Sequence, residues 1–297
     1  MPRSHKQVEP KVAKIKSMID LHEEYAAMVR SKQAVVLDLS HWLPSLRFDC
    51  RPIWPGEVVV VWGDVGTGKT AILQNLARTA AMDTLTCLLY ELELPGTICY
   101  ERFIAMEHGI TCSEVQQDCH AGGCLPVQCL GNIYVCDDSQ MSMSAIYHTA
   151  CSLESRAGTR PEVILIDYAA LVAGRDGQVG SRYDRVSTMA EDCKILARAL
   201  NCIVILAAQI HRKEGDDGMT SRPVGLHSGK DSGSLEAVAD LLLGIWRPDE
   251  DRDELIVKLL KNRKGKPGRT IRCIFDAPKM RISEMREEPE FCDDFVK

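Results

Sequence analysis

The chain has 297 residues, of which 45% are hydrophobic and 26% are charged, a composition that is ordinary for a folded globular protein with a substantial core. Its formal net charge of −6 excludes attraction to nucleic acid through overall charge, although a local site or one built by several subunits remains compatible with it. No apolar run approaches the ~20 residues that cross a bilayer and the N-terminus has no signal-peptide core, so we expect a cytoplasmic protein without membrane contact.

The first predicted element is an amphipathic helix over residues 11–30. Its apolar side chains recur at spacings of three, four and seven residues, at Val12, Ile15, Ile19, Ala26 and Val29. One helix cannot bury such a stripe alone, so it either folds back on its own domain or docks on a neighbouring subunit. We assign residues 1–46 to an N-terminal helix and linker arm, 47–283 to one α/β domain and 284–297 to an acidic tail.

A glycine-rich loop follows the first predicted core strand. The run Val58–Trp62 is apolar, and the next eight residues, Gly63-Asp64-Val65-Gly66-Thr67-Gly68-Lys69-Thr70, read GxxxxGKT. A strand, a glycine loop and a helix in this order are typical of a phosphate-binding P-loop, where backbone amides and a helix N-terminus surround an anion. We predict that these residues bind ATP, that Lys69 reaches the β- and γ-phosphates and that Thr70 ligates Mg²⁺.

Beyond the P-loop, strand-length apolar runs alternate with helical patterns, which is typical of a parallel sheet with crossover helices. The expected strands are 57–62, 85–90, 132–136, 162–167 and 202–208, and the expected helices are 69–82, 96–108, 142–156 and 183–200. Three closely spaced runs, 241–246, 255–260 and 270–275, then predict antiparallel hairpins. The fold class is therefore α/β, with a mostly parallel twisted sheet flanked by helices and C-terminal antiparallel hairpins.

Polar residues end several of these strands, at the edge where open α/β sheets bind ligands. Asp167 ends a buried apolar strand and is the candidate for orienting Mg²⁺; an aspartate that caps a loop is the alternative. Glu91 and Glu93 follow the strand at 85–90 and share a face, so both could look toward the γ-phosphate and either could activate the attacking water. Gln209 could sense the γ-phosphate or could be a plain polar strand end.

Two cations near the end of the domain, Lys261 and Arg263, follow an apolar run. In an extended segment they would point to the same side, which suits the stabilisation of a phosphoryl oxyanion. Salt bridges on a solvated hairpin are an equally compatible interpretation.

Thirteen cysteines would stay reduced in the cytosol, and Cys87, Cys202 and Cys273 lie in strand-like runs where they would fill the core. A zinc site could be argued only for the cluster Cys112, Cys119, His120, Cys124, Cys129 and Cys136. That cluster lacks a CxxC pair and its gaps are irregular, which favours unligated thiols.

Taken together, the motifs resemble the RecA-type ATPase domain of DnaB-family replicative helicases, which has a P-loop NTPase fold. The matching segments occur in the family's order and cover about residues 47–283. They are the P-loop, YELEL at 90–94, IYVCDD at 133–138, ILIDY at 164–168, AQIHR at 208–212, DSGSLE at 231–236 and KNR at 261–263.

The resemblance implies a role for several residues and a set of partners. Glu93 falls on the catalytic glutamate, Gln209 on the γ-phosphate sensor, and Lys261 with Arg263 on the cationic pair that enters the neighbouring subunit's ATP site. The implied DNA contacts are Arg175, Arg182, Arg222, Lys230, Asp231 and Gly233. The implied cofactors are ATP and Mg²⁺, and the implied partners are single-stranded DNA, further copies in a hexameric ring, and a helicase loader or primase.

We therefore expect an ATP-dependent ring helicase that translocates on single-stranded DNA in replication. A RecA- or RadA-like recombination ATPase that forms open filaments is one alternative, and a non-processive regulatory ATPase of the same fold is another. Two departures from the family pattern stand out. The segment Tyr168-Ala169-Ala170-Leu171 lacks a glutamine that the family often has, and only the short helix at 11–30 precedes the domain.

Overall fold

The computed structural model describes residues 16–30, 35–123, 125–126, 130–139, 141–167, 182–210, 223–226, 233–249 and 251–285. The chain divides into two compact units, Met1–Val35 and Val36–Lys297. The first unit contains helix α1 (Met18–Arg30). This helix begins later than the predicted residue 11, because the Ser17 hydroxyl accepts the Asp20 amide while the Asp20 carboxylate accepts the Ser17 amide at 2.9 Å.

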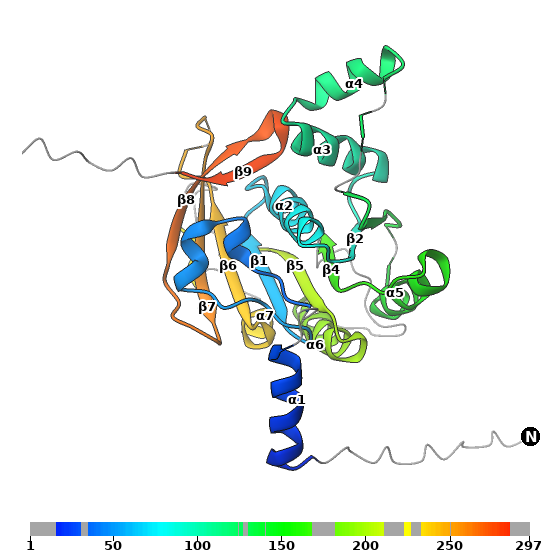
Figure 1. The fold of residues 1–297 in the computed structure, drawn as a ribbon. Coiled ribbons are helices and arrows are strands. Elements are labelled where there is room, and N and C mark those ends of the chain that lie inside the picture. Colours follow the sequence, from blue (N-terminus) through cyan, green and yellow to red (C-terminus); the bar gives the residue numbers. More distant parts are fainter. Residues whose placement is uncertain are drawn as a thin grey trace, which may run out of the picture. The chain divides into compact units, whose positions relative to one another are not determined.

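A nine-stranded sheet forms the centre of the second unit (Figure 1), in the order β3-β2-β4-β5-β1-β6-β7-β8-β9. Its strands are β1 (Val58–Gly63), β2 (Cys87–Glu91), β3 (Ile133–Cys136), β4 (Val163–Asp167), β5 (Ile203–Gln209), β6 (Leu241–Trp246), β7 (Glu254–Asn262), β8 (Thr270–Asp276) and β9 (Arg281–Glu284). The strands from β3 to β6 in this order pair in parallel, and those from β6 to β9 pair antiparallel. The predicted α/β fold class with C-terminal hairpins is confirmed.

The predicted helices also form, with small shifts at their ends. They are α2 (Lys69–Met82), α3 (Gly96–His108), α5 (Met143–Ala157) and α6 (Arg182–Leu200). Elements that were not predicted are α4 (Cys112–His120), α7 (Gly233–Val238), β9 and the short 3-10 helices η1 (Leu39–His41), η2 (Pro44–Phe48) and η5 (Ala277–Lys279). Helix α4 begins with a capping box between Thr111 and Glu114, a signal that the sequence does contain.

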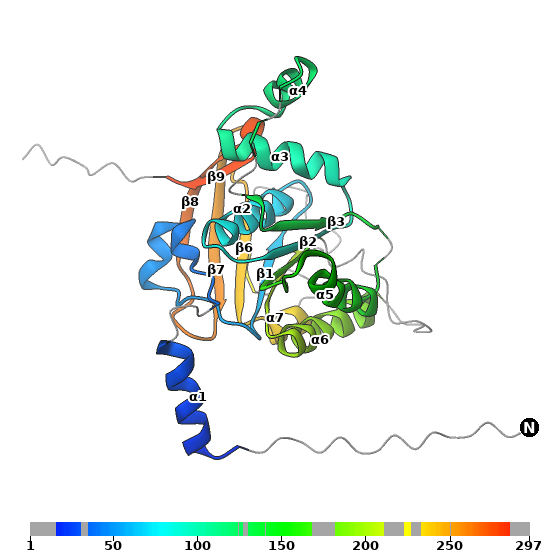
Figure 2. The ribbon, with the colours of Figure 1, turned by 45° about the vertical axis from the view of Figure 1, so that its right-hand side comes forward.

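Helices cover both faces of the sheet, with α5, α6 and α7 on one face and α2 on the other (Figures 1 and 2). Residues of β1 alternate between the two layers, so Val58, Val60 and Trp62 join the core under α6. Every residue of β1 is buried. This burial on both faces explains why the strand reads as a continuous apolar run.

The segment before β1 is anchored on α2 and β9. His41 in η1 lies 2.8 Å from the Asp83 carboxylate, and the Trp42 indole donates to the Ile282 carbonyl at 2.9 Å. The Ser45 amide donates to the Glu284 carboxylate at 2.9 Å. Glu284, which sequence analysis placed in the acidic tail, is therefore the last residue of an ordered strand.

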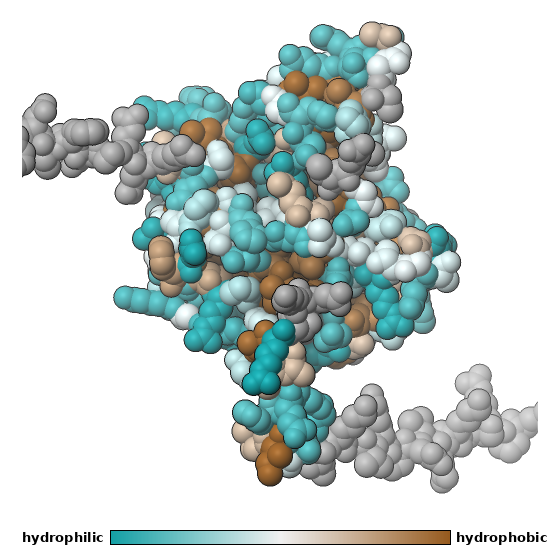
Figure 3. All heavy atoms as spheres, viewed as in Figure 1, coloured by the Kyte–Doolittle hydropathy of each residue, from teal (hydrophilic) through white to brown (hydrophobic). Residues whose placement is uncertain are grey.

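Large exposed apolar side chains are concentrated on α1, where Met18, Ile19, Leu21, Tyr25 and Val29 are each more than 40% exposed. Figure 3 shows apolar side chains on this helix beside hydrophilic ones. None of the helices within the described ranges has the length and apolarity that crossing a membrane requires. The apolar face of α1 is instead typical of a helix that packs against a protein surface.

Candidate active site

A cavity of about 370 Å³ lies at the carboxyl edge of the parallel strands. It is lined by Val65, Gly66, Gly68, Lys69, Thr70, Ala71, Glu93, Arg102, Asp167, Gln209, Phe275 and Met280. Strand register brings these segments together, because Gly63 of β1 is paired with Gln209 of β5. The structure thus brings together in one cavity the P-loop, Glu93, Asp167 and Gln209, which the sequence predicted as separate candidates.

Glycines give the P-loop its shape. Gly66 and Gly68 have φ angles of +73° and +95°, which residues with a side chain adopt at a cost. At Gly63 a Cβ atom would lie 2.6 Å from the Ile245 side chain and from the Thr67 hydroxyl. The loop therefore needs glycine at these positions, for backbone conformation or for close packing.

The P-loop places the N-terminus of α2 and the side chain of Lys69 at the cavity. Gly68, the residue before α2, makes no side-chain cap, so the first amides of the helix point toward the cavity as anion donors. The Lys69 ammonium donates to the Asp64 carbonyl at 2.6 Å, and the Thr67 hydroxyl donates to the same oxygen at 2.8 Å. Burial lowers the pKa of Lys69, while the charge of Asp167 acts in the opposite direction.

Asp167 and Thr70 fit a magnesium ion. Asp167 is 1% exposed; burial raises its pKa to about 6, and a hydrogen bond from Thr70 acts to lower it. Its Oδ2 atom has no hydrogen-bond partner among the described residues, which is unusual for a buried carboxylate. Carboxylate and hydroxyl oxygens are hard ligands that suit Mg²⁺. Thr70 and Asp167, the predicted metal ligands, supply oxygen atoms of this kind.

The two glutamates after β2 differ in their surroundings. Glu91 is 0% exposed and accepts the amides of Glu93 at 3.4 Å and Leu94 at 3.3 Å. Burial, and then the nearby charge of Asp167, raise the pKa of Glu91 to about 7. Only Glu93 lines the cavity. The expectation that both face the phosphate is wrong, because β2 ends at Glu91 and the strand alternation does not extend to Glu93.

Arg102 is a cavity residue that sequence analysis missed. It lies on α3, and its charge acts to lower the pKa of Asp167. The amide of Gly96, at the start of α3, donates to the Asp137 carboxylate at 2.8 Å. Asp137, which sequence analysis left without a chemical role, therefore caps the helix that carries Arg102 to the cavity. Phe275 and Met280 from the C-terminal hairpins add an apolar wall that was also not predicted.

Lys261 and Arg263 lie at the opposite end of the parallel strands, where these strands begin. Asn262 pairs with Leu241, the first residue of β6, and Leu241 pairs with Val59 near the start of β1. The P-loop follows the other end of β1. The length of the strand therefore separates the two cations from their own chain's cavity. Both instead contact carbonyl groups at the end of α7.

Four of the six predicted DNA contacts lie outside the residues that the structure describes. They are Arg175, Arg222, Lys230 and Asp231. Arg182 begins α6, although its side chain is outside the described set, and Gly233 begins α7.

The predicted cysteine cluster is described only in part. Cys124 and Cys129 lie outside the described residues, whereas Cys112 and Cys119 lie on α4. Across the described part of the chain, no group of three His, Cys, Asp or Glu side chains could hold a metal ion. Cys87, Cys202 and Cys273 are buried free thiols, as predicted.

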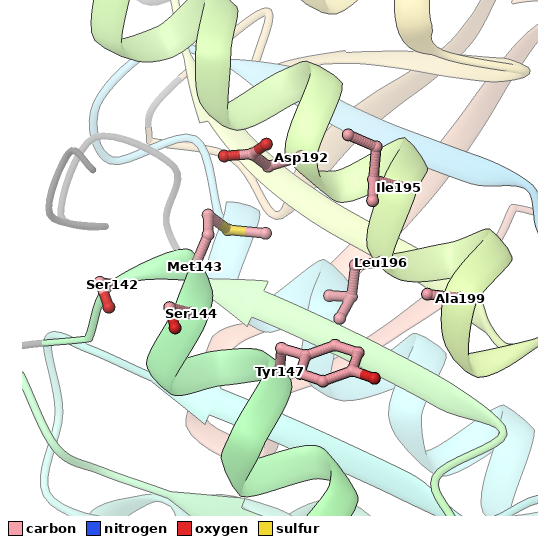
Figure 4. A pocket seen from close by; sticks show the side chains of 8 residues that line it. All are labelled: Ser142, Met143, Ser144, Tyr147, Asp192, Ile195, Leu196 and Ala199. Carbon is pink, nitrogen blue, oxygen red and sulfur yellow. The ribbon is translucent and has the colours of Figure 1, made fainter. Parts of the chain in front are cut away.

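A second cavity, of about 330 Å³, forms a groove between α5 and α6. Its lining residues are Ser142, Met143, Ser144, Tyr147, Asp192, Ile195, Leu196 and Ala199. Figure 4 shows Tyr147 from α5 and Leu196 from α6 pointing toward one another across it. Ile195 is 60% exposed and Tyr147 is 39% exposed, so the groove presents apolar surface to its surroundings.

Comparison with known proteins gives a family match over most of the chain. Residues 50–284 match the family described as DnaB-like helicase C terminal domain. The chain is 27% identical over 242 residues to the replicative DNA helicase DnaB of Mycoplasma genitalium, which covers 72% of this chain and 50% of that protein. It is 25% identical over 257 residues to that of Haemophilus influenzae, covering 81% and 54%. The chain thus spans about half the length of these curated relatives.

Two solved structures have a similar fold. One is an ATPase domain with a TM-score of 0.74 at 19% identity, covering 92% of this chain and all of that one. The other, a DnaB-like replicative helicase whose structure is described together with its interactions with primase, has a TM-score of 0.73 at 20% identity, covering 91% and 68%. At these identities the likeness supports the fold alone.

Proposed function

Because the chain belongs to the family of DnaB-like helicase C-terminal domains, we propose that it is an ATP-driven ring helicase that translocates on single-stranded DNA during replication. The observation that carries this proposal is the division of the catalytic groups between two edges of one sheet. The P-loop, Glu93 and Asp167 line a cavity at one edge, and two cations lie at the other. Such a division is expected when each ATP site is completed by a neighbouring copy.

We assign the phosphate cavity to ATP and Mg²⁺. The P-loop amides and Lys69 bind the phosphates, and Thr70 with Asp167 hold the metal, which when bound neutralises phosphate charge. Glu93 is the candidate base that takes a proton from the attacking water. Gln209 and Arg102 line the same cavity and are candidates to contact the γ-phosphate, with Arg102 supplying a positive charge from within the same chain.

The remaining positive charge comes from a second copy of the chain. Lys261 and Arg263 cannot reach their own chain's cavity because the length of the sheet separates them from it. A head-to-tail arrangement would bring them to the cavity of the next copy, and repeated head-to-tail contacts close into a ring when the rotation fits. Six copies is the number that the family resemblance implies.

We further infer that α1 docks into the groove between α5 and α6 of a neighbouring copy. Five large apolar side chains of α1 are exposed, and the groove exposes Tyr147 and Ile195. An apolar helix face and an apolar groove are matched partners in helix-in-groove recognition. Of the two options that the sequence left open for this helix, we propose docking on another subunit.

Single-stranded DNA is the proposed polymer in the channel of the ring. The resemblance assigns the contacts to residues 174–184 and 212–233, and six copies of their basic residues would offset the acidic net charge locally. A loader or a primase is a proposed protein partner, by analogy with the primase interactions described for one structural relative.

The test is the ATPase rate with and without single-stranded DNA, for the wild type, Lys69→Ala and Arg263→Ala. The proposal predicts stimulation by DNA, and loss of turnover in both variants. Unwinding of forks with 5′ or 3′ tails should accompany the stimulation. A rate that DNA does not change would favour a regulatory ATPase, and filaments on single strands in electron micrographs would favour a recombination ATPase.

A further inference from the structure

Asp240 connects three parts of the second unit at the edge where the parallel strands begin. Its Oδ2 atom accepts the Val58 amide at 2.8 Å and a hydrogen bond from the Lys194 ammonium, while its own amide donates to the Val58 carbonyl at 2.9 Å. The side chain is only 12% exposed. Asp240 is therefore fixed to β1 and to α6 by contacts that do not involve Lys261 or Arg263.

Arg263 is held by this aspartate and by the end of α7. Its Nη1 lies 3.2 Å from Asp240 Oδ1, and its Nη2 donates to the Ala237 carbonyl at 2.8 Å. Its backbone amide also donates to the Asp240 carbonyl at 2.9 Å. Two guanidinium nitrogens and the backbone are thus fixed, which sets both the position and the plane of the group.

Lys261 ends on the same helix terminus, where its ammonium donates to the Glu236 carbonyl. Asn262, between the two cations, donates instead to the Asp49 carbonyl at 2.8 Å. The last two residues of β7 are consequently held by hydrogen bonds to two different segments. We call this set of contacts, made by Asp240, Glu236 and Ala237 to Lys261 and Arg263, the cation cradle.

The cradle does not neutralise the cations that it holds. Lys194, Lys261 and Arg263 lie close to the carboxylates of Asp240 and Glu236, so positive charge exceeds negative charge among these five side chains. Burial, and then the neighbouring Arg263, lower the pKa of Lys261, as expected where cations crowd together. The Arg263 side chain is still 49% exposed, and the guanidinium has five N–H donors. It can bind an incoming phosphate without leaving Asp240.

We propose that Asp240 is a positioning residue, which together with the carboxyl end of α7 fixes Arg263 in the orientation needed at a neighbouring copy's ATP. This inference rests on the proposed role of Arg263 in a second copy. Its physical basis is pre-organisation, because a long side chain that is already ordered loses less freedom when the transition state forms. Asp240 accepts a hydrogen bond from Val58, the first residue of β1. Gly63, the last residue of β1, begins the P-loop of the same chain. One strand thereby links the two ATP sites that each chain serves.

The test uses Asp240→Asn, with Glu57→Gln as a matched control. The Glu57 side chain is 15% exposed and pairs with Lys264, the residue after Arg263. It accepts the Trp54 amide at 2.9 Å and forms no ion pair with Lys261 or Arg263. We expect Asp240→Asn to lower DNA-stimulated turnover by about ten- to a hundredfold, with nucleotide affinity and ring assembly retained. Glu57→Gln should keep wild-type turnover.

Mixed rings show on which side of the interface the defect lies. Glu93→Gln and Arg263→Ala chains are mixed as the reference pair, and their turnover should exceed the average of the two parents. Asp240→Asn should be rescued in the same way by Glu93→Gln chains, which supply an intact Arg263, and should not be rescued by Arg263→Ala chains. A structural defect of its own ATP site would give the reverse pattern, and that result would overturn the proposal.

Other outcomes separate this proposal from the proposed function. Failure of the reference pair would remove the role of Arg263 in a second copy, and the inference with it. A successful reference pair together with full activity of Asp240→Asn would overturn only the positioning role. If Asp240→Asn does not fold, Arg263→Lys tests the same point, because it keeps the charge and loses the forked contact. It should behave like Arg263→Ala in mixtures, and wild-type turnover would contradict the need for a fixed guanidinium.

Discussion

Glu91 and Asp167 are paired across the neighbouring strands β2 and β4, yet only Asp167 lines the phosphate cavity. The carboxylate of Glu91 is turned inward, where it accepts two backbone amides of the segment that leads to α3. Glu91 therefore shapes the turn that presents Glu93. The two glutamates, only two positions apart, should have different functions.

Substitution of each glutamate by glutamine separates these functions. Glu93→Gln should lower the turnover number by about 10²- to 10⁴-fold, because the amide cannot accept a proton from water, and should leave nucleotide affinity nearly unchanged. Glu91→Gln should keep most of its turnover, since it can still accept the backbone amides. Steady-state ATPase rates with single-stranded DNA, together with equilibrium binding of a fluorescent nucleotide, measure both effects. Equal losses in the two variants would contradict the assignment of the base to Glu93.

Arg102 should contribute to catalysis from within the same chain. Removal of a charge-assisted hydrogen bond costs about 1.5–3 kcal/mol, so Arg102→Gln should lower kcat/KM for ATP by about 10- to 100-fold. The matched control is Arg78→Gln, because Arg78 pairs with Glu107 at 2.7 Å and does not line the phosphate cavity. Comparable losses in both arginine variants would point to general destabilisation instead.

Docking of α1 on a neighbouring copy predicts a weaker assembly when the groove between α5 and α6 is made polar. Burial of one large aliphatic side chain contributes about 1.5–3 kcal/mol, so Ile195→Lys should weaken subunit association by about 10- to 100-fold. Val135→Lys is the control, because Val135 is 38% exposed on β3 and lies outside the groove. Sedimentation with ATP should show smaller species for Ile195→Lys and for a chain that lacks residues 1–35. An unchanged size distribution in both would exclude this docking site.

The His41–Asp83 contact makes part of the stability pH-dependent. The hydrogen bond that the His41 ring donates to the Asp83 carboxylate raises the pKa of His41 above its ordinary value of 6.5. A raised histidine pKa stabilises the folded state fully below the unfolded pKa, and this contribution is lost as pH rises through the folded value. Because the His41 side chain is 56% exposed, we expect a coupling energy of only about 0.5 kcal/mol.

A double-mutant cycle with His41→Gln and Asp83→Asn isolates this coupling from other effects of each substitution. Urea unfolding at about pH 5.5 should give the full coupling, and unfolding at about pH 9 should give a value near zero. A coupling energy that is the same at both pH values would show that charge on His41 is not involved.

The sequence predicted those parts of the site that are encoded locally. The P-loop is one continuous motif with a buried strand before it, and Asp167 ends a strand that is apolar throughout. The parallel sheet follows from strands that are buried on both faces. In each case the pattern and its consequence lie within about ten residues, so no tertiary information was needed.

The parts that were missed depend on contacts between distant segments. Arg102 lies on a helix whose pattern does not reveal which polar side chain faces the cavity, and Glu91 could not be separated from Glu93 without the end of β2. Strand β9 has only four residues, too few for its alternation to be recognised. The contact between Asp240 and Arg263 depends on the register of β6 and β7, which no local pattern specifies.

If each ATP site is completed by Arg263 of another copy, turnover must depend on the concentration of the chain. Turnover per chain should be measured at saturating ATP and single-stranded DNA over a range of chain concentrations, with particle mass recorded in parallel. Turnover per chain should fall steeply as oligomers dissociate, and Arg263→Ala should stay inactive at every concentration. Constant turnover per chain from a particle with the mass of one 33.0 kDa chain would contradict this role of Arg263.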